Sequence, residues 1–282
     1  MASQYRAVFS WGILCAGVVV WAFWGSLAEI ADRWRRDPQY SHGWLVPLFS
    51  LYLLYIRRNL IPSTGLVQRW WGLMIVALAM LARFTAVMFY QPWLDAGSLL
   101  LALLGCFATI GGRAGLRWSF PAVAFLAFMI PLPFRLQSAL GGSLQAIATK
   151  SSTYLLQAIG VPAIAEGNVI LLTNERIGVM EACNGLSMLM TFFALACGFA
   201  LLVERHWLYA VSLILAAAPI AVAANVVRIT VTALLIEGER NATAKVVFHD
   251  VAGWLMMPLG VGLLLALMWY LDRLTRPALR PT

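Results

Sequence analysis

Residues 184–203 form the run NGLSMLMTFFALACGFALLV, which contains no charged side chain. A helix of about 20 mainly apolar residues is long enough to cross the hydrocarbon core of a bilayer. Similar runs recur along the chain, and we expect each of them to be a membrane-spanning helix. The other runs are 7–29, 43–57, 70–90, 96–112, 117–134, 207–234, which Pro219 interrupts, and 247–271.

The composition supports the same class. Of the 282 residues, 62% are hydrophobic and only 11% are charged, whereas a soluble domain has about 45–50% apolar and about 25% charged residues. One soluble core cannot bury that much apolar surface, which excludes an ordinary cytosolic enzyme. We therefore predict an all-α integral membrane protein, a single polytopic domain over residues 1–282 with about eight transmembrane helices.

The net charge is +8, but the basic residues lie in short segments between apolar runs. This distribution is typical of a membrane protein's topology and does not indicate a nucleic-acid partner. If the N-terminus is cytoplasmic, the inside segments are the richer in Lys and Arg for their length, although Arg33, Arg35 and Arg36 oppose this bias. We expect both termini in the cytoplasm. The four cysteines have no CxxC spacing, so neither a disulfide framework nor a zinc site is predicted.

The segment 135–182 is then extracytoplasmic, and its two parts differ. Its first part, RLQSALGGSLQAIATKSSTYLLQAIG, has helical spacing and is expected either to lie on the membrane surface or to enter the bundle. Its second part, VPAIAEGNVILLTNERIGVMEA, has short β-branched runs with turn residues between them, which predicts a small hairpin or loop.

Three polar sites fall next to apolar runs at one predicted membrane face. Ionisable groups are costly in such places and are usually functional. The sites are Glu181-Ala182-Cys183-Asn184-Gly185, Asn225 with Arg228, and His249 with Asp250. A further outward histidine, His42, lies near the second run.

Each of these residues has a functional and a structural interpretation. Cys183 precedes a predicted helix, where unpaired backbone N–H groups favour the nucleophilic thiolate, but it also suits a capping or packing role. Arg228 suits an oxyanion or a carboxylate, and equally a structural pair with Glu181, Glu237 or Glu239, or a lipid phosphate. His249 suits proton transfer, or the role of an interfacial side chain.

A cysteine, an arginine and a histidine at one face together favour acyl transfer through a thioester. The motifs HExxH, GxSxG, GxxxxGK[ST] and GxGxxG are absent from the sequence. The alternative is a transporter or export component for exopolysaccharide or lipid-linked precursors. In that case Arg228, Arg176 and Arg135 would bind phosphate and Cys183 would be incidental.

Five motifs in order along the chain resemble the exosortase/archaeosortase family of integral membrane cysteine transpeptidases. They are Y-S-H-G-W-L-V-P at 40–47, I-P-L-P at 130–133, E-A-C-N-G-L at 181–186, N-V-V-R at 225–228 and V-F-H-D, which contains His249. The archaeal branch carries arginine at the position of His249, so the chain is more similar to the bacterial exosortases.

The resemblance implies a catalytic trio of Cys183 as nucleophile, Arg228 and His249, with Glu181, Asn184, Asn225 and His42 as supporting or substrate-binding residues. It implies a site at the periplasmic face of the bacterial inner membrane. The expected substrates are secreted proteins with a C-terminal sorting signal of the PEP-CTERM type, made of a Pro-Glu-Pro-like motif, a transmembrane helix and a basic tail. Such systems accompany exopolysaccharide production. Besides these substrates the expected partners are membrane lipids, and no cofactor, metal or nucleic acid is implied.

Overall fold

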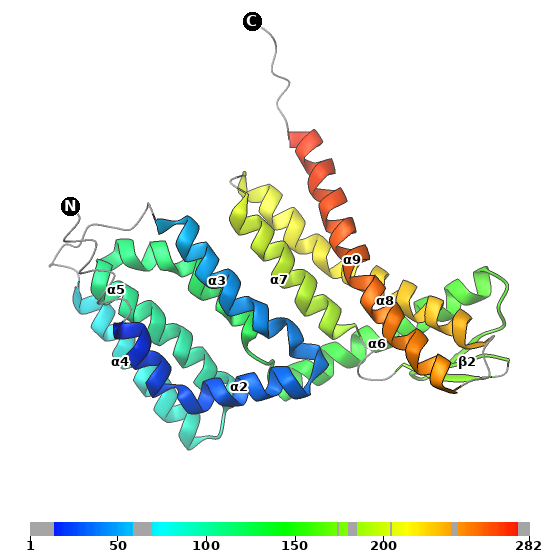
Figure 1. Ribbon diagram of the computed structural model, residues 1–282, viewed down its shortest axis with the longest axis horizontal. Helices are drawn as coiled ribbons and strands as arrows, with labels where there is room; N and C mark the ends of the chain where they lie inside the picture. Colours follow the sequence, from blue (N-terminus) through cyan, green and yellow to red (C-terminus); the bar gives the residue numbers. More distant parts are fainter. Residues whose placement is uncertain are drawn as a thin grey trace, which may run out of the picture. The chain divides into compact units, whose positions relative to one another are not determined.

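The computed structural model describes residues 14–58, 69–173, 175–179, 185–203, 205–237 and 242–275. Of residues 69, 242–250, 252–254 and 275 it describes the backbone alone. The chain forms two compact units, Met1–Pro133 and Phe134–Thr282, and Figure 1 shows that both consist mainly of helices. The class predicted from composition, an all-α membrane protein, is confirmed. The expectation of a single domain stays a prediction.

The first unit is entirely helical in its described part (Figure 1). It begins with a helix at Leu14–Ala22. The elements that follow are α2 (Trp24–Arg36), the 3-10 helix η1 (Pro38–Trp44), α3 (Leu45–Ile56), α4 (Arg69–Met88), α5 (Pro92–Phe125) and the 3-10 helix η4 (Leu126–Met129).

The first apolar run was predicted as one helix at 7–29, and the described part of it is bent. The chain bends by 73° between the helix Leu14–Ala22 and α2, and α2 continues to Arg36. Ile30 and Trp34 are buried, while Arg36 is exposed and its Nε donates to Asp32 Oδ1 over 2.9 Å. The basic cluster predicted in a loop therefore forms the last turn of a helix, where positive charges interact favourably with the helix dipole.

Helix α5 contains the run predicted at 96–112 and the first part of the run predicted at 117–134, which continues into η4. Its backbone is not helical at Gly112, which has φ 61° and ψ −149°, a conformation that side chains with a Cβ rarely adopt. The chain bends there, and the bend brings the rings of Phe107 and Trp118 edge to face, with their centroids 5.7 Å apart. The break thus falls at the end of the first predicted run.

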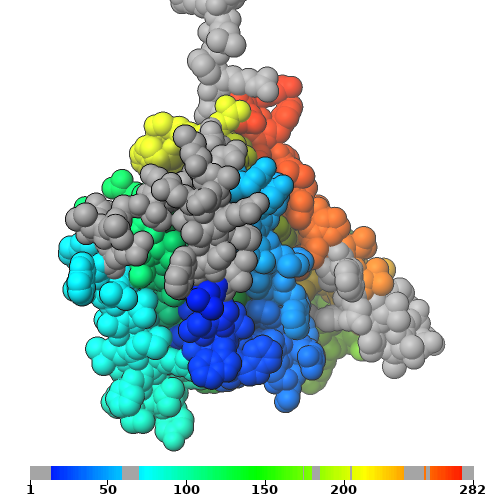
Figure 2. All heavy atoms as spheres, turned by 60° about the vertical axis from the view of Figure 1, so that its left-hand side comes forward, coloured from blue at the N-terminus to red at the C-terminus, as the bar shows by residue number. Residues whose placement is uncertain are grey.

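An ion pair lies within the apolar helices of this unit. Arg83 Nε of α4 is 3.7 Å from Asp95 Oδ1 of α5, and its guanidinium carbon lies 4.0 Å from the centre of the Phe23 ring. Ser26 of α2 donates a hydrogen bond to the other oxygen of Asp95. These contacts join α2, α4 and α5, which Figure 2 shows from a second side with the N-terminal helices in dark blue and α4 in cyan.

The second unit combines four helices with a small sheet. Its elements are α6 (Phe134–Ala158), β1 (Ile164–Glu166), β2 (Val169–Leu171), β3 (Arg176–Gly178), α7 (Leu186–Leu202), α8 (Trp207–Glu237) and α9 (Ala242–Thr275). The strands form an antiparallel sheet in the order β1-β2-β3, one strand more than the predicted hairpin. Helix α6 packs on α8, which is one of the two placements that the sequence left open.

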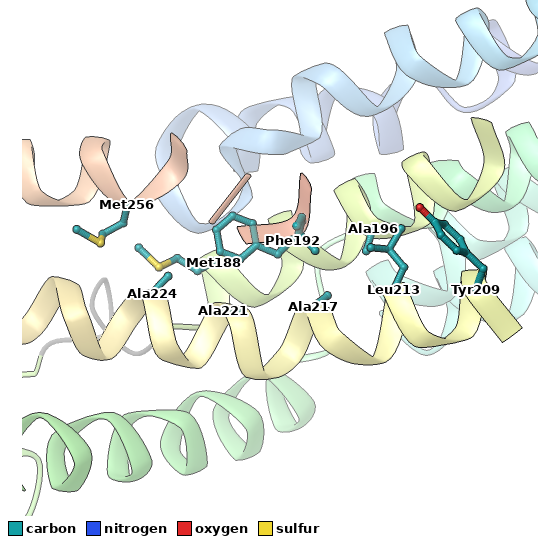
Figure 3. Packing of buried hydrophobic residues seen from close by; sticks show 10 residues of the cluster. Met188, Phe192, Ala196, Tyr209, Leu213, Ala217, Ala221, Ala224 and Met256 are labelled. Carbon is teal, nitrogen blue, oxygen red and sulfur yellow. The ribbon is translucent and has the colours of Figure 1, made fainter. Parts of the chain in front are cut away.

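Helices α7, α8 and α9 share one apolar core, shown in Figure 3. Met188 lies beside Ala224 and Met256 at one end, and Ala196 lies beside Leu213 near the other. Helix α8 therefore runs antiparallel to α7. Pro219 does not end α8, contrary to the predicted interruption.

A close approach between α7 and α9 fixes their register. A Cβ added at Gly260 of α9 would overlap the ring of Phe192 of α7, which is fully buried. Glycine is needed here because the neighbouring ring occupies the space of a side chain. Met256 and Gly260, one turn apart on α9, thus face Met188 and Phe192, one turn apart on α7, and the two helices are parallel.

Four helices of the described chain are long and apolar enough to cross a membrane, or five if the bent pair at the start counts as one span. They are Trp70–Met88, Pro92–Met129, Trp207–Glu237 and Leu255–Leu274. Helix α7 is apolar but shorter, with 17 residues. The eight spans and the cytoplasmic termini stay predictions.

The contact between Gly260 and Phe192 gives a matched pair of variants. We expect Gly260→Ala to lower the free energy of unfolding by about 1–3 kcal/mol, the usual effect of overpacking a filled core. Gly262→Ala meets no atom within 4 Å and should be neutral or stabilising, because alanine favours the helix. Thermal unfolding of both variants in detergent checks this, and equal melting temperatures would contradict the register.

Candidate active site

The sequence-predicted site residues are distributed unequally over the described structure. Glu181, Cys183 and Asn184 lie outside the described residues, which resume at Gly185. Asn225 and Arg228 lie on α8. His249 lies on α9, of which the backbone is described at this position. His42 lies in the first unit, on η1.

Gly185 is the first described residue after Cys183, and its backbone conformation and contacts are well defined. This residue has φ 82° and precedes the first turn of α7, where its carbonyl accepts the N–H of Leu189 over 2.9 Å. A Cβ at Gly185 would lie 3.0 Å from Nδ2 of Asn225, whose side chain is 1% exposed. Asn225 therefore packs directly against the residue that begins α7.

Val179 is the last described residue before Cys183, and it is held by packing and by hydrogen bonds. Its side chain is buried in a cluster that includes Ile170 of β2 and Ile229 of α8. Its N–H donates to the carbonyl of Asn168 over 2.9 Å, and its carbonyl accepts a hydrogen bond from Gln145 Nε2 of α6. Side chain and backbone of Val179 are thus all engaged.

One turn of α8 reaches both of these positions. Asn225 and Ile229 are four residues apart and share a helix face. Asn225 packs against Gly185, and Ile229 belongs to the cluster that holds Val179. Arg228 lies in the same turn, half-buried, three residues after Asn225. This turn therefore spans the two ends of the segment 180–184.

Position 249 is placed by the register of α9. It precedes Met256 by seven residues, nearly two turns, and so shares the face that packs on α7 and α8. Met256 is level with Met188, which is only two residues from the start of α7. Position 249 thus lies beyond the N-terminal end of α7, and it also precedes the apolar span that begins at Leu255.

Arg228 and His249 are consequently brought to one end of the second unit by the packing of the helices. Asn225 is level with Gly185, and Arg228 follows by three residues, or about 4.5 Å along the helix axis. Both positions lie at the end of the bundle where the segment with Cys183 joins α7.

His42 has a local set of partners in the first unit. Its Nε2 lies 3.2 Å from the carbonyl oxygen of Phe128, and burial lowers the pKa of the ring below its ordinary value. Nearby, Trp34 Nε1 donates to Met129 O over 2.9 Å, and the N–H of Leu132 donates to Tyr40 Oη over 3.2 Å. Side chains of α2 and η1 thus hold residues 128–132. A contribution of His42 to the site of Cys183 stays a prediction.

Two supporting residues, Gln145 and Val179, were not singled out by the sequence. Gln145 was part of a segment recognised only by its helical spacing, and Val179 was one apolar residue in a predicted loop. The signal available was a series of polar residues at 145, 149 and 152, which share one helix face and pack toward α8.

These observations define a mainly helical integral membrane protein in which the predicted site residues on α8 and α9 lie at the end of the second unit where α7 begins. The family model described as transmembrane exosortase matches residues 34–267 of the chain. The protein belongs to the transmembrane exosortase family. No curated protein and no solved structure matches the chain. Among the described residues, no group of three or more His, Cys, Asp or Glu is placed to hold a metal ion.

The contact between Gly185 and Asn225 can be tested against a glycine of similar conformation. An alanine in the left-handed region costs about 1–2 kcal/mol, a cost that Gly185→Ala shares with Gly160→Ala, since Gly160 has φ 88°. Only the first variant also presses on Asn225, because a Cβ at Gly160 meets no atom within 4 Å. We expect Gly185→Ala to unfold at a lower temperature than Gly160→Ala in thermal unfolding. Equal melting temperatures of the two variants would contradict the contact.

Proposed function

We propose that this protein is a membrane cysteine protease or transpeptidase that cleaves the C-terminal sorting signal of secreted proteins through a thioester at the periplasmic face. Membership of the exosortase family supports a role in protein sorting at a membrane. The observation that carries the proposal is the turn Asn225–Ile229 of α8. It reaches both ends of the segment that contains Cys183, and it includes Arg228.

Cys183 is the proposed nucleophile. It precedes Gly185 by two residues in the sequence, and two residues span at most about 7 Å. The N-terminus of α7, which begins at Leu186, presents unpaired backbone N–H groups that favour a thiolate in its vicinity. The other cysteines, Cys15, Cys106 and Cys197, lie half-buried within apolar helices.

Arg228 is the proposed oxyanion donor. The thiolate attacks the scissile carbonyl carbon, an S–C bond forms, and the carbonyl electron pair moves onto oxygen. A guanidinium is always charged and presents several donors in a fixed plane, so it suits this developing negative charge. The packing of one α8 turn against both Gly185 and Val179 supports a position of Arg228 beside the segment.

His249 is the proposed acid and base. It first takes the proton of the Cys183 thiol and becomes an imidazolium. When the oxyanion collapses, the C–N bond breaks and the leaving amine takes this proton from the imidazolium. A water molecule or an acceptor amine then attacks the thioester while His249 takes its proton. This step releases the thiolate and leaves an acid or a new amide on the secreted protein. The register of α9, which brings position 249 to the end of α7, supports this role.

Asn225 is proposed to support the nucleophile through Gly185, which its side chain contacts. Glu181, Asn184 and His42 are proposed as further supporting or substrate-binding residues. The cytoplasmic termini and the outward-facing site rest on the distribution of Lys and Arg. The inner membrane and the periplasm rest on the resemblance to the bacterial exosortases.

The nucleophile is tested by replacing single cysteines. In Cys183→Ala, expressed in the native host, we expect the full-length sorting-signal protein to accumulate in the membrane, because no thioester can form. Cys197→Ala, a cysteine on α7 itself, is the matched control and should process normally. Immunoblots of membrane and secreted fractions measure both. Unchanged processing by Cys183→Ala at normal enzyme levels would exclude the thioester and favour the transport interpretation.

The role of Arg228 predicts sensitivity to a substitution that keeps the charge. Arg228→Lys should lower the processing rate about 10²–10³-fold, the usual effect of losing an oxyanion donor. Val227→Lys places the same side chain one residue earlier, on a more exposed face, and should process near the normal rate. Cleavage rates of a sorting-signal peptide by the purified variants measure this. A normal rate for Arg228→Lys would remove Arg228 from the mechanism.

A further inference from the structure

We propose that Gln145 of α6 is a positioning residue for the nucleophile, because its side-chain amide holds the Val179 carbonyl at the start of the segment that contains Cys183. This inference rests on the proposed function, in which Cys183 forms the thioester. It adds a residue on a different helix, outside the motifs at 181–186, 225–228 and 249.

The contact lies at the last described peptide before the segment. Gln145 Nε2 donates to the Val179 carbonyl oxygen, which belongs to the peptide plane shared with residue 180. Because a peptide is planar, holding the oxygen fixes the orientation of the whole unit. The last described carbonyl before Cys183 is therefore held by the amide of Gln145.

The side chain and the N–H of Val179 are held by other parts of the protein, and Gln145 holds the third group, the carbonyl. Its side chain is 2% exposed and its N–H donates to Asn168 O over 2.9 Å. Without Gln145 the part-buried Val179 carbonyl would lose this side-chain donor, and a carbonyl that is shielded from water is costly to leave without a partner.

Gln145 is itself held relative to Arg228. Thr149 Oγ1, fully buried, donates to the Gln145 carbonyl over 2.8 Å. One turn further, Ser152 Oγ donates to the carbonyl of Val226 on α8 over 3.3 Å, and Thr230 Oγ1 donates to the same oxygen over 2.8 Å. Val226 lies two residues before Arg228. Helix α6 thus connects the start of the Cys183 segment to the α8 turn with the proposed oxyanion donor.

The chain supplies a matched control on the same helix. Gln157 Nε2 donates to the Ala163 carbonyl over 2.8 Å, which is the same kind of contact between an α6 amide and a backbone oxygen. Ala163 leads into β1, away from the segment with Cys183. A purely structural role for such contacts would give the two glutamines equal effects.

The experiment compares Gln145→Met with Gln157→Met, which keep the length of the side chain and remove the donor. Both are made in the full chain, purified in detergent, and assayed with a peptide that contains a Pro-Glu-Pro motif. We expect Gln145→Met to lower kcat about 10²-fold, the effect of misplacing a catalytic group by about 1 Å. KM should stay unchanged, since Gln145 does not touch the substrate in this account. Gln157→Met should keep both constants, at a similar melting temperature.

A second variant keeps the test decisive if Gln145→Met does not accumulate as a folded protein. Gln145→Asn retains a polar donor and is one methylene shorter, so it should fold and still lose kcat. In both Gln145 variants, Cys183 should react with a thiol reagent at a rate that differs from the parent, while Gln157→Met leaves that rate unchanged. These rates are measured with Cys15, Cys106 and Cys197 replaced by alanine.

The outcomes separate the two proposals. If Cys183→Ala blocks cleavage and the Gln145 variants keep the kcat of Gln157→Met, the positioning role is overturned and the proposed function stands. If Cys183→Ala still cleaves the peptide, the proposed function fails and the positioning role fails with it. A loss of kcat in Gln145→Met or Gln145→Asn, with unchanged KM and with Gln157→Met active, supports the inference.

Discussion

The packing of Asn225 against Gly185 is the contact on which the account of the site depends. Gly185 adopts φ 82°, and a Cβ added there would lie only 3.0 Å from Asn225 Nδ2. Helix α8 therefore approaches the start of α7 closely. The same turn of α8 also carries Ile229, which is buried with Val179. Gly185 and Val179, the described residues on either side of Cys183 in the sequence, are therefore both in contact with one helical turn. The proposal that Cys183 reacts beside Arg228 depends on these two contacts.

The second constraint is the parallel register of α7 and α9. Phe192 fills the space of the missing side chain at Gly260, and Met256 lies beside Met188. A sequence with larger residues at these positions would shift α9 and, with it, position 249. The small residue Gly260 thus determines which ends of α7 and α9 lie together.

The sequence predicted the class of fold and the positions of most helices, because long apolar runs leave few alternatives in a membrane. It placed Asn225 and Arg228 on one helix, near the outer end of the apolar run 207–234. It did not predict the bend after Ala22 or the third strand, since both depend on packing between distant residues. Gln145 and Val179 were missed for the same reason: a glutamine in a helix and a valine in a loop have no local signal that shows their contact. His42 was selected for its position, and its partner Phe128 is 86 residues away in the sequence.

The central claim, that Cys183 lies beside Arg228 and position 249, is tested most directly by chemical cross-linking. Cys15, Cys106 and Cys197 are first replaced by alanine, and one new cysteine is introduced at position 228, 249 or 227. A bis-maleimide with about the reach of an extended arginine side chain is added, and cross-linked peptides are identified by mass spectrometry. The account predicts links from Cys183 to positions 228 and 249, and none to position 227, which lies on a more exposed face of α8. Links to 227 in place of 228, or no link to 249, would contradict it.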